Sequence, residues 1–220
     1  MLLVLWDIDG TLVDTAKHGR NAFVEAFETV VGRRPRPVEF AGRTDHEIAL
    51  SMLDGERERL PRLLEELAAA LEARKEAMGR EGHAYPGVPE VLAALDARDG
   101  VVQSLLTGNI ETNAALKVGA FGLERWFDFE VGAYGSDPHE ERSELVAVAR
   151  ERAAAKYGTP TAAVLVGDTP LDVRAAQAAG ARAVAVATGF GDPEALRASR
   201  PDVLLPDLRD TGAAVEAIVG

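Results

Sequence analysis

Cysteine is absent from the 220-residue sequence, and aromatic residues make up only 5% of it. Without cysteine the chain has no disulfide, no thiolate metal site and no thiol nucleophile. No apolar run approaches the length that crosses a bilayer. The apolar segment nearest the N-terminus, residues 2–6, is followed at once by Asp7 and Asp9, which argues against a cleaved signal peptide. We therefore expect a soluble, cytoplasmic protein.

Basic residues are scarce as well: 24 Lys and Arg stand against 36 Asp and Glu, a net charge of −12. This balance argues against nucleic acid or an anionic membrane as the main partner. An acidic protein can still bind an anionic substrate through a local cluster of donors or a metal. The 47% hydrophobic content supports a sizeable core, in one domain with an insertion or in two small domains. No feature of the sequence specifies an oligomeric state.

The first fifteen residues carry the strongest signal in the chain. Leu2–Trp6 is a short apolar run that ends abruptly in Asp7, with Asp9 and then Gly10 and Thr11 behind it. Such a run is typical of a strand buried on both faces at the centre of a parallel sheet. Two carboxylates at the end of a buried strand are costly unless protons or a cation neutralise them. A divalent metal with further oxygen ligands would satisfy this requirement.

The next segment, residues 15–83, has the residue pattern of a helical insertion. Apolar residues at helical spacing predict helices over residues 16–31, 46–53 and 56–79. Thr44 or Asp45 is expected to cap the second helix, and Pro61 is expected to mark the first turn of the third. No convincing strand interrupts this segment.

From residue 84 onward, predicted strands and helices alternate. The predicted strands cover residues 101–106, 127–131, 162–166, 183–187 and 203–205, and the predicted helices cover 89–96, 110–119, 143–157 and 170–180. Such alternation specifies right-handed crossovers and a doubly wound parallel α/β sheet. We therefore predict an α/β core domain of residues 1–14 and 84–220, with a helical cap domain of residues 15–83 inserted after the first strand.

Polar residues recur where the predicted strands end. Asp7 and Asp9 follow the first strand, Thr107-Gly108-Asn109 follows the second, and Asp168 follows the strand over 162–166. Each of these residues alone would be interpreted as a turn or a helix cap. Because ligands of open α/β sheets bind at the carboxyl ends of the strands, their recurrence favours one shared site.

These motifs resemble those of the haloacid dehalogenase-like superfamily of phosphotransferases, in its phosphoglycolate phosphatase-like branch with a small helical cap. The matching segments are Asp7-Ile-Asp9-Gly-Thr11, the strand into Thr107-Gly-Asn109, and Gly167-Asp168-Thr-Pro-Leu-Asp172. The resemblance covers the whole chain and implies a Rossmann-like core. It also implies a Mg²⁺-dependent phosphatase that acts on a small phosphorylated metabolite through an aspartyl-phosphate.

The resemblance also implies roles for the residues at the first strand end. Asp7 would be the nucleophile that attacks phosphorus. Asp9 would protonate the leaving alkoxide and then activate water, while its backbone carbonyl reaches the metal. Thr11 would orient Asp9 through its hydroxyl or its backbone.

The other two motifs would bind the phosphoryl group and the metal. Thr107, Gly108 and Asn109 precede a helix, where a hydroxyl and exposed N–H groups suit a phosphoryl oxygen. Asp168 would be the remaining protein ligand of Mg²⁺. Asp172 would orient a metal-bound water or a cation, and as an acid in the first turn of a helix it has an ordinary dipole explanation as well.

The family's usual active-site lysine is absent from its expected place. Residues 136–145 contain no lysine, and the chain has only four, Lys17, Lys75, Lys117 and Lys156. Arg142 is the nearest cation, and we predict that it replaces the lysine. Lys117 is the alternative, although a solvated surface charge is the simpler expectation for it.

Substrate choice should lie in the cap. Arg43 and Thr44 resemble a substrate-facing loop, whereas Lys17, His18 and Arg20 near the hinge are expected to be surface residues. A phosphoglucomutase-like activity stays open, as do pyrophosphatase and nucleotidase specificities and a catalytically weak binding protein on the same fold. Asp9 argues against halogen-removing and phosphonate-cleaving relatives. A receiver domain would be shorter, and a dinucleotide-binding protein would need a Gly-x-Gly-x-x-Gly turn that the chain lacks.

Overall fold

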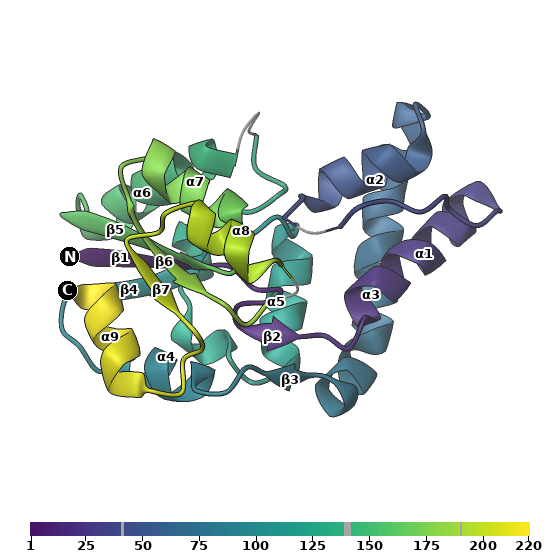
Figure 1. Cartoon of the computed structure of the whole chain (residues 1–220). Coiled ribbons are helices and arrows are strands. Elements are labelled where there is room, and N and C mark those ends of the chain that lie inside the picture. The colour runs from purple at the N-terminus through teal and green to yellow at the C-terminus, as the bar shows by residue number, and fades with distance from the viewer. Residues whose placement is uncertain (41, 139–141, 190) are drawn as a thin grey trace.

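A five-stranded parallel sheet forms the centre of the computed structural model, which describes residues 1–40, 42–138, 142–189 and 191–220 (Figure 1). The strand order is β4-β1-β5-β6-β7, so the first strand of the sequence lies in the interior of the sheet. The strands are β1 (Leu2–Trp6), β4 (Val101–Leu105), β5 (Ala162–Gly167), β6 (Arg182–Val186) and β7 (Val203–Leu205). The predicted α/β fold with a doubly wound parallel sheet is confirmed.

Strand β1 is buried on both faces because its side chains alternate between two hydrophobic cores. Leu3 and Leu5 belong to the core under α6 (Arg142–Tyr157), α7 (Pro170–Ala178) and α8 (Pro193–Ala198). Val4 and Trp6 belong to the core under α4 (Val88–Asp96), α5 (Glu111–Ala120) and α9 (Thr211–Val219). The near-continuous apolar run that suggested a central strand therefore has the predicted physical cause.

Residues 15–83, called the helical insertion from here on, consist mainly of helices joined by loops, and they have a core of their own. The insertion contains α1 (His18–Val31), α2 (Asp45–Leu53), a 3₁₀ turn (Arg57–Arg59) and α3 (Leu60–Glu81). Phe27, Leu63 and Leu67 are buried in this third core. A short antiparallel pair, β2 (Val13–Asp14) with β3 (His83–Ala84), forms a separate two-stranded sheet that brings the two ends of the insertion together. Where a domain boundary falls stays a prediction.

The helix ends within the insertion follow local capping chemistry. Thr44, rather than Asp45, caps α2: its hydroxyl accepts a hydrogen bond from Glu47 N at 3.2 Å, and the Glu47 side chain accepts one from Thr44 N. Pro61 lies in the first turn of α3 as predicted, so this helix begins four residues later than the expected start at 56. Among the described helices, α3 included, none is long and apolar enough to cross a membrane.

The strand predicted over residues 127–131 is wrong. Residues Phe129–Val131 form a 3₁₀ turn, and Asp128 N donates one hydrogen bond to Gln103 O of β4 at 2.9 Å; the nearby parallel bridge joins Leu106, just after β4, to Ala133. The cause is local, because the Asp128 carboxylate accepts a hydrogen bond from Glu130 N and so favours a turn over a ladder.

Candidate active site

A cavity of about 280 Å³ lies between the carboxyl ends of the central strands and the helical insertion. Asp7, Asp9, Thr107 and Asp168 line it from the sheet, and Arg20, Phe23, Phe40 and Arg43 line it from the insertion. The strand ends that the sequence singled out therefore do meet at one edge of the sheet. The cavity is at the small end of the range for small-molecule sites, which favours a compact ligand.

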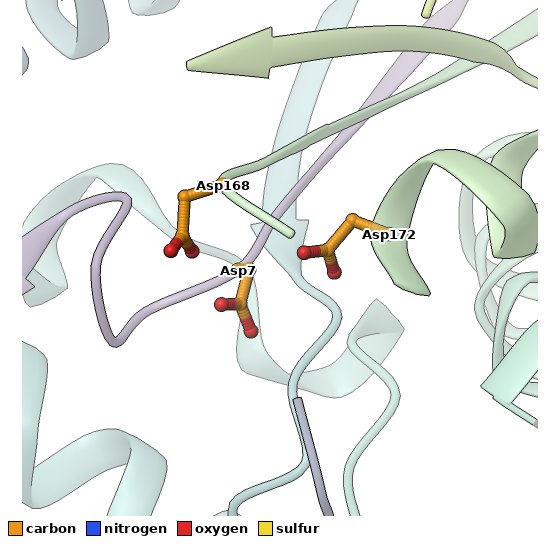
Figure 2. A group of neighbouring side chains, drawn as sticks. All are labelled: Asp7, Asp168 and Asp172. Atoms are coloured by element: carbon orange, nitrogen blue, oxygen red, sulfur yellow. The ribbon is translucent and has the colours of Figure 1, made fainter. Parts of the chain in front are cut away.

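Three buried carboxylates form an acidic cluster (Figure 2), and two of them, Asp7 and Asp168, line the cavity. Asp7 follows β1, Asp168 follows β5, and Asp172 projects from the first turn of α7. One oxygen from each carboxylate lies within 4.8 Å of the others. Parallel strands bring the first two together because their carboxyl ends meet at the same edge of the sheet.

The protonation of this cluster is strongly perturbed. Burial and then repulsion from Asp172 raise the pKa of Asp7 to about 7, although Arg142 acts to lower it. Burial, together with the charges of Asp7 and Asp172, raises the pKa of Asp168 to about 8. Without a further cation, the cluster therefore retains protons at a pH where isolated carboxyl groups have lost them.

Arg142 supplies part of the countercharge. Its guanidinium donates hydrogen bonds to Asp7 Oδ1 at 2.9 Å and to Asp172 Oδ1 at 2.7 Å. The side chain is buried, and it enters from the first residue of α6. Arg142, the cation that the sequence predicted beside Asp7, thus contacts Asp7 directly. A planar guanidinium suits this bridge because its N–H groups can donate hydrogen bonds to two carboxylates at once.

Thr11 orients a different carboxylate from the one predicted. Its hydroxyl donates a hydrogen bond to Asp168 Oδ1 at 3.0 Å, and no hydrogen bond joins its hydroxyl to Asp9 among the described residues. Gly10, at φ 91°, makes the tight turn that allows this approach. A Cβ at Gly10 would lie 2.4 Å from Asp168 Oδ2, so glycine is required sterically as well.

Asp172 has a structural role in addition to its place in the cluster. Its Oδ2 accepts hydrogen bonds from Thr169 N at 3.1 Å and from Thr169 Oγ1 at 2.6 Å, which completes a capping box at the start of α7. Its Oδ1 accepts from Arg142. Both oxygens are therefore engaged, so Asp172 is better placed to hold Arg142 than to bind a metal directly.

The cluster has the donor set that Mg²⁺ prefers. Asp7 and Asp168 offer carboxylate oxygens whose pKa values are raised by burial and by repulsion from neighbouring carboxylates, and a bound cation would relieve that repulsion. Mg²⁺ commonly takes one or two protein carboxylates and keeps several waters, so these two residues suffice. The residues present thus fit a divalent cation.

The side chain of Asp9 lies in a second cluster with Lys117 and Asn109. Lys117 Nζ donates to Asp9 Oδ2 at 2.6 Å and to Asn109 Oδ1 at 2.7 Å. Asn109 Nδ2 donates to the same Asp9 oxygen at 2.9 Å. The expectation that Lys117 is a solvated surface charge is wrong, since its side chain is only 8% exposed. Its sequence position on a helix gave no sign of this burial.

The loop after β4, residues 107–109, lines the cavity and packs against the insertion. Thr107 is buried, and its hydroxyl oxygen accepts a hydrogen bond from Asn109 Nδ2 at 2.8 Å. Gly108 lies directly against the insertion: a Cβ there would meet the backbone of Arg43 and Thr44 at 2.6 and 2.9 Å. The absence of a side chain at Gly108 therefore lets the insertion approach the loop.

Asp45 connects the insertion to the core and was missed as a site residue. Its Oδ2 accepts hydrogen bonds from Ile110 N and Asn113 Nδ2, both at 2.9 Å, and its N–H donates to Gly108 O at 2.8 Å. Ile110 cannot cap α5 with its own apolar side chain, so the insertion provides the capping carboxylate. Burial raises the pKa of Asp45, while Lys117 and these hydrogen bonds act to lower it.

The insertion residues expected to face a substrate divide into two groups. Arg43 lines the cavity, with its guanidinium donating to Glu47 O and Ser51 Oγ, whereas the Thr44 hydroxyl caps α2. Lys17 and Arg20, expected to be ordinary surface residues, also line the cavity. His18 instead pairs with Glu81 at 3.0 Å.

Comparison with known proteins agrees with this geometry. A family model described as haloacid dehalogenase-like hydrolase matches residues 1–180. The "Probable phosphatase IndB" of Dickeya dadantii is 30% identical over 226 residues, covering 99% of this chain and 94% of that protein. Phosphoglycolate phosphatase 1 of Pseudomonas aeruginosa is 31% identical over 216 residues, covering 94% of this chain and 77% of its own length. The crystal structure of a hydrolase from Pseudomonas syringae covers 100% of both chains with a TM-score of 0.73; at 21% identity, this likeness shows the fold.

The acidic cluster predicts that Mg²⁺ stabilises the protein more at alkaline than at acidic pH. The unfolded Asp7 and Asp168 have ordinary pKa values, and the raised folded values mean that the folded chain binds more protons between about pH 4 and pH 8. Stability of the metal-free chain therefore falls as pH rises through this window. We expect Mg²⁺ to raise Tm by about 2–4 °C more near pH 8 than near pH 5, the shift that ~1 kcal/mol produces. Thermal unfolding with and without chelator measures it.

Asp168→Asn is the matched variant for this measurement. It removes one of the mutually repelling charges, so the metal-free variant should lose less stability between about pH 5 and pH 8 than the parent. The response of Tm to Mg²⁺ should largely disappear. An equal response to Mg²⁺ at both pH values in the parent would contradict the assignment of the cluster as a cation site.

Gly108→Ala should weaken seating of the insertion against the core. The added methyl group would collide with backbone atoms of Arg43 and Thr44, which cannot rotate away. We expect kcat/KM for a phosphate ester to fall about 10-fold or more, the effect of ~1.4 kcal/mol. Gly212→Ala, in the exposed first turn of α9, is the control for a glycine replacement as such and should leave activity unchanged. Normal kinetics of Gly108→Ala would show that the close approach is unimportant.

Proposed function

The chain belongs to the haloacid dehalogenase-like hydrolase family and is a phosphoric monoester hydrolase, and we propose that it uses Mg²⁺ and an aspartyl-phosphate intermediate on Asp7. Its substrate is a small phosphorylated metabolite. The observation that carries this proposal is the position of the Asp7 carboxylate, which lines the cavity, belongs to the acidic cluster and contacts Arg142.

Phosphoryl transfer begins with attack by a carboxylate oxygen of Asp7 on phosphorus. A new P–O bond forms to Asp7 as the bond from phosphorus to the substrate alkoxide breaks. Asp9, which lines the same cavity two residues away, donates its proton to the departing alkoxide, so the product leaves as an alcohol.

Hydrolysis of the intermediate then restores the enzyme. The Asp9 carboxylate, now ionised, takes a proton from a water molecule, and the resulting hydroxide attacks phosphorus. The bond between phosphorus and Asp7 breaks, inorganic phosphate is released and Asp9 is again protonated. The half-exposed Asp9 side chain suits the role of acid and base because it must reach both a leaving group and water.

Asp7, Asp168 and the backbone carbonyl of Asp9 are the proposed holders of Mg²⁺, with Asp172 acting through Arg142. When bound, Mg²⁺ supplies positive charge that offsets the charge of these carboxylates and of the phosphoryl group. Thr107 and the N–H groups of Gly108 and Asn109 are the proposed phosphoryl ligands. All three residues line the cavity, which supports this role.

The helical insertion is proposed to act as a cap that closes over the cavity and selects the substrate. Arg43 and Arg20 line the cavity, and the Arg20 guanidinium lies 4.6 Å from the centre of the Phe40 ring. Their arrangement suits a compact substrate that carries polar groups beyond the phosphate. The phosphatase names of the relatives support the same class of substrate.

Asp7→Asn tests the nucleophile. The amide keeps the shape of the side chain and can still accept a hydrogen bond from Arg142, but it cannot attack phosphorus. We expect kcat for p-nitrophenyl phosphate to fall at least about 10³-fold with little change in Tm. A phosphate-release screen across phosphorylated metabolites, run with Mg²⁺ and with chelator, identifies the substrate and the metal requirement. Full turnover by Asp7→Asn would rule out the proposed mechanism.

Arg142→Ala tests the countercharge at Asp7. Two buried carboxylates would lose a shared hydrogen-bond donor, so we expect kcat to fall about 10²–10³-fold. Arg142→Lys keeps one positive charge and should retain more activity than the alanine variant. Arg125→Ala, which removes an exposed arginine stacked over Trp126, is the control and should behave like the parent. Activity of Arg142→Ala within about 3-fold of the parent would contradict the role.

A further inference from the structure

Lys117 is the most deeply placed cation on the Asp9 side of the cavity, and its surroundings are unusual for a lysine. Its side chain is 8% exposed, compared with 37% for Lys156. A buried ammonium group is costly unless it is paired and hydrogen-bonded. Here one hydrogen bond goes to Asp9 and another to Asn109, so the cost is offset at the site itself.

Lys117, Asn109 and Asp9 form a closed triangle of hydrogen bonds that fixes one oxygen of the Asp9 carboxylate. Asp9 Oδ2 accepts from both partners, at 2.6 Å and 2.9 Å. Within the described residues, no hydrogen bond reaches Asp9 Oδ1. Because 44% of the Asp9 side chain is exposed and Asp9 lines the cavity, a bound ligand can reach this carboxylate.

The two cations of the site serve different carboxylates. Arg142 contacts Asp7 and Asp172, whereas Lys117 contacts Asp9. They also come from different elements, since Arg142 begins α6 and Lys117 lies near the end of α5. Lys117 is therefore not a second countercharge for the nucleophile.

Helix α5 lies between the sheet and the helical insertion (Figure 1). It therefore also contacts the insertion. Its N-terminus is bound by Asp45 from the insertion. Gly19, at the start of α1, packs so close to Lys117 that a Cβ there would lie 3.4 Å from Nζ. The seating of the insertion and the position of the lysine are thus set on the same helix.

From these contacts we propose that Lys117 is a positioning residue, which holds the Asp9 carboxylate by one oxygen so that the other faces the leaving group. This inference rests on the proposed function, because it assigns Lys117 to the proton-transfer step of that reaction. Lys117 itself forms no bond to substrate in this scheme.

The dependence of rate on the leaving group distinguishes this role from a merely structural one. p-Nitrophenolate leaves without help from an acid, whereas an alkoxide needs the proton that Asp9 provides. Lys117→Met keeps the length and apolar stem of the side chain and removes its charge and donors. We expect kcat/KM for an alkyl phosphate to fall about 10²-fold, and that for p-nitrophenyl phosphate to fall less than about 5-fold.

Four further variants complete the experiment. Lys117→Gln keeps a hydrogen-bond donor and should lie between the parent and Lys117→Met on the alkyl phosphate. It also provides a second test if Lys117→Met folds poorly. Lys75→Met, the same replacement on the neighbouring helix α3, should leave both rates unchanged. Asp9→Asn should show the same leaving-group dependence as Lys117→Met, and the double variant Asp9→Asn/Lys117→Met should be no slower than Asp9→Asn.

The outcomes separate this inference from the proposed function. Equal losses on both substrates in Lys117→Met, or additive losses in the double variant, would overturn the positioning role. If Asp9→Asn shows leaving-group dependence and Lys117→Met does not, only the inference about Lys117 fails. If Asp9→Asn shows no such dependence, the acid role in the proposed function fails as well.

Discussion

The concentration of negative charge at one edge of the sheet is the constraint on which the rest of the site depends. Asp7 and Asp168 are held there by the carboxyl ends of two adjacent parallel strands, and burial raises the pKa of both. Such an arrangement persists only where the surrounding structure supplies compensating donors and cations. Arg142, the Thr11 hydroxyl and the proposed Mg²⁺ together provide that compensation.

The site is divided electrostatically into two parts. Asp7 lies in a buried part with Arg142, where its carboxylate is held for the attack on phosphorus that we propose. Asp9 lies in a more open part with Lys117 and Asn109, where an acid and base can reach both ligand and solvent. Two carboxylates only two residues apart can thus have different chemistry because their environments differ. Helix α5 joins the second part to the insertion through Asp45.

Much of the fold was predictable because local pattern and tertiary structure agree. The run Leu2–Trp6 is apolar throughout because β1 packs against helices on both faces. Pro61 and Thr44 marked helix starts through chemistry that acts within a few residues. The prediction of a strand over residues 127–131 was wrong because it was based on apolar residues alone. The hydrogen bond from Glu130 N to Asp128 is also local, but the apolar pattern does not reveal it.

The sequence by itself determined which strand ends carry polar groups, and a parallel topology is sufficient to bring such ends together. It therefore indicated Asp7, Asp9, Thr107 and Asp168 as neighbours. Only the tertiary structure decided which partner each group contacts: Thr11 with Asp168 rather than Asp9, Lys117 inside the site, and Asp45 across to α5. The physical reason is that these contacts join residues 65 to 157 positions apart in the chain. Their existence depends on side-chain direction and on the distance between packed elements, which spacing along a sequence does not encode.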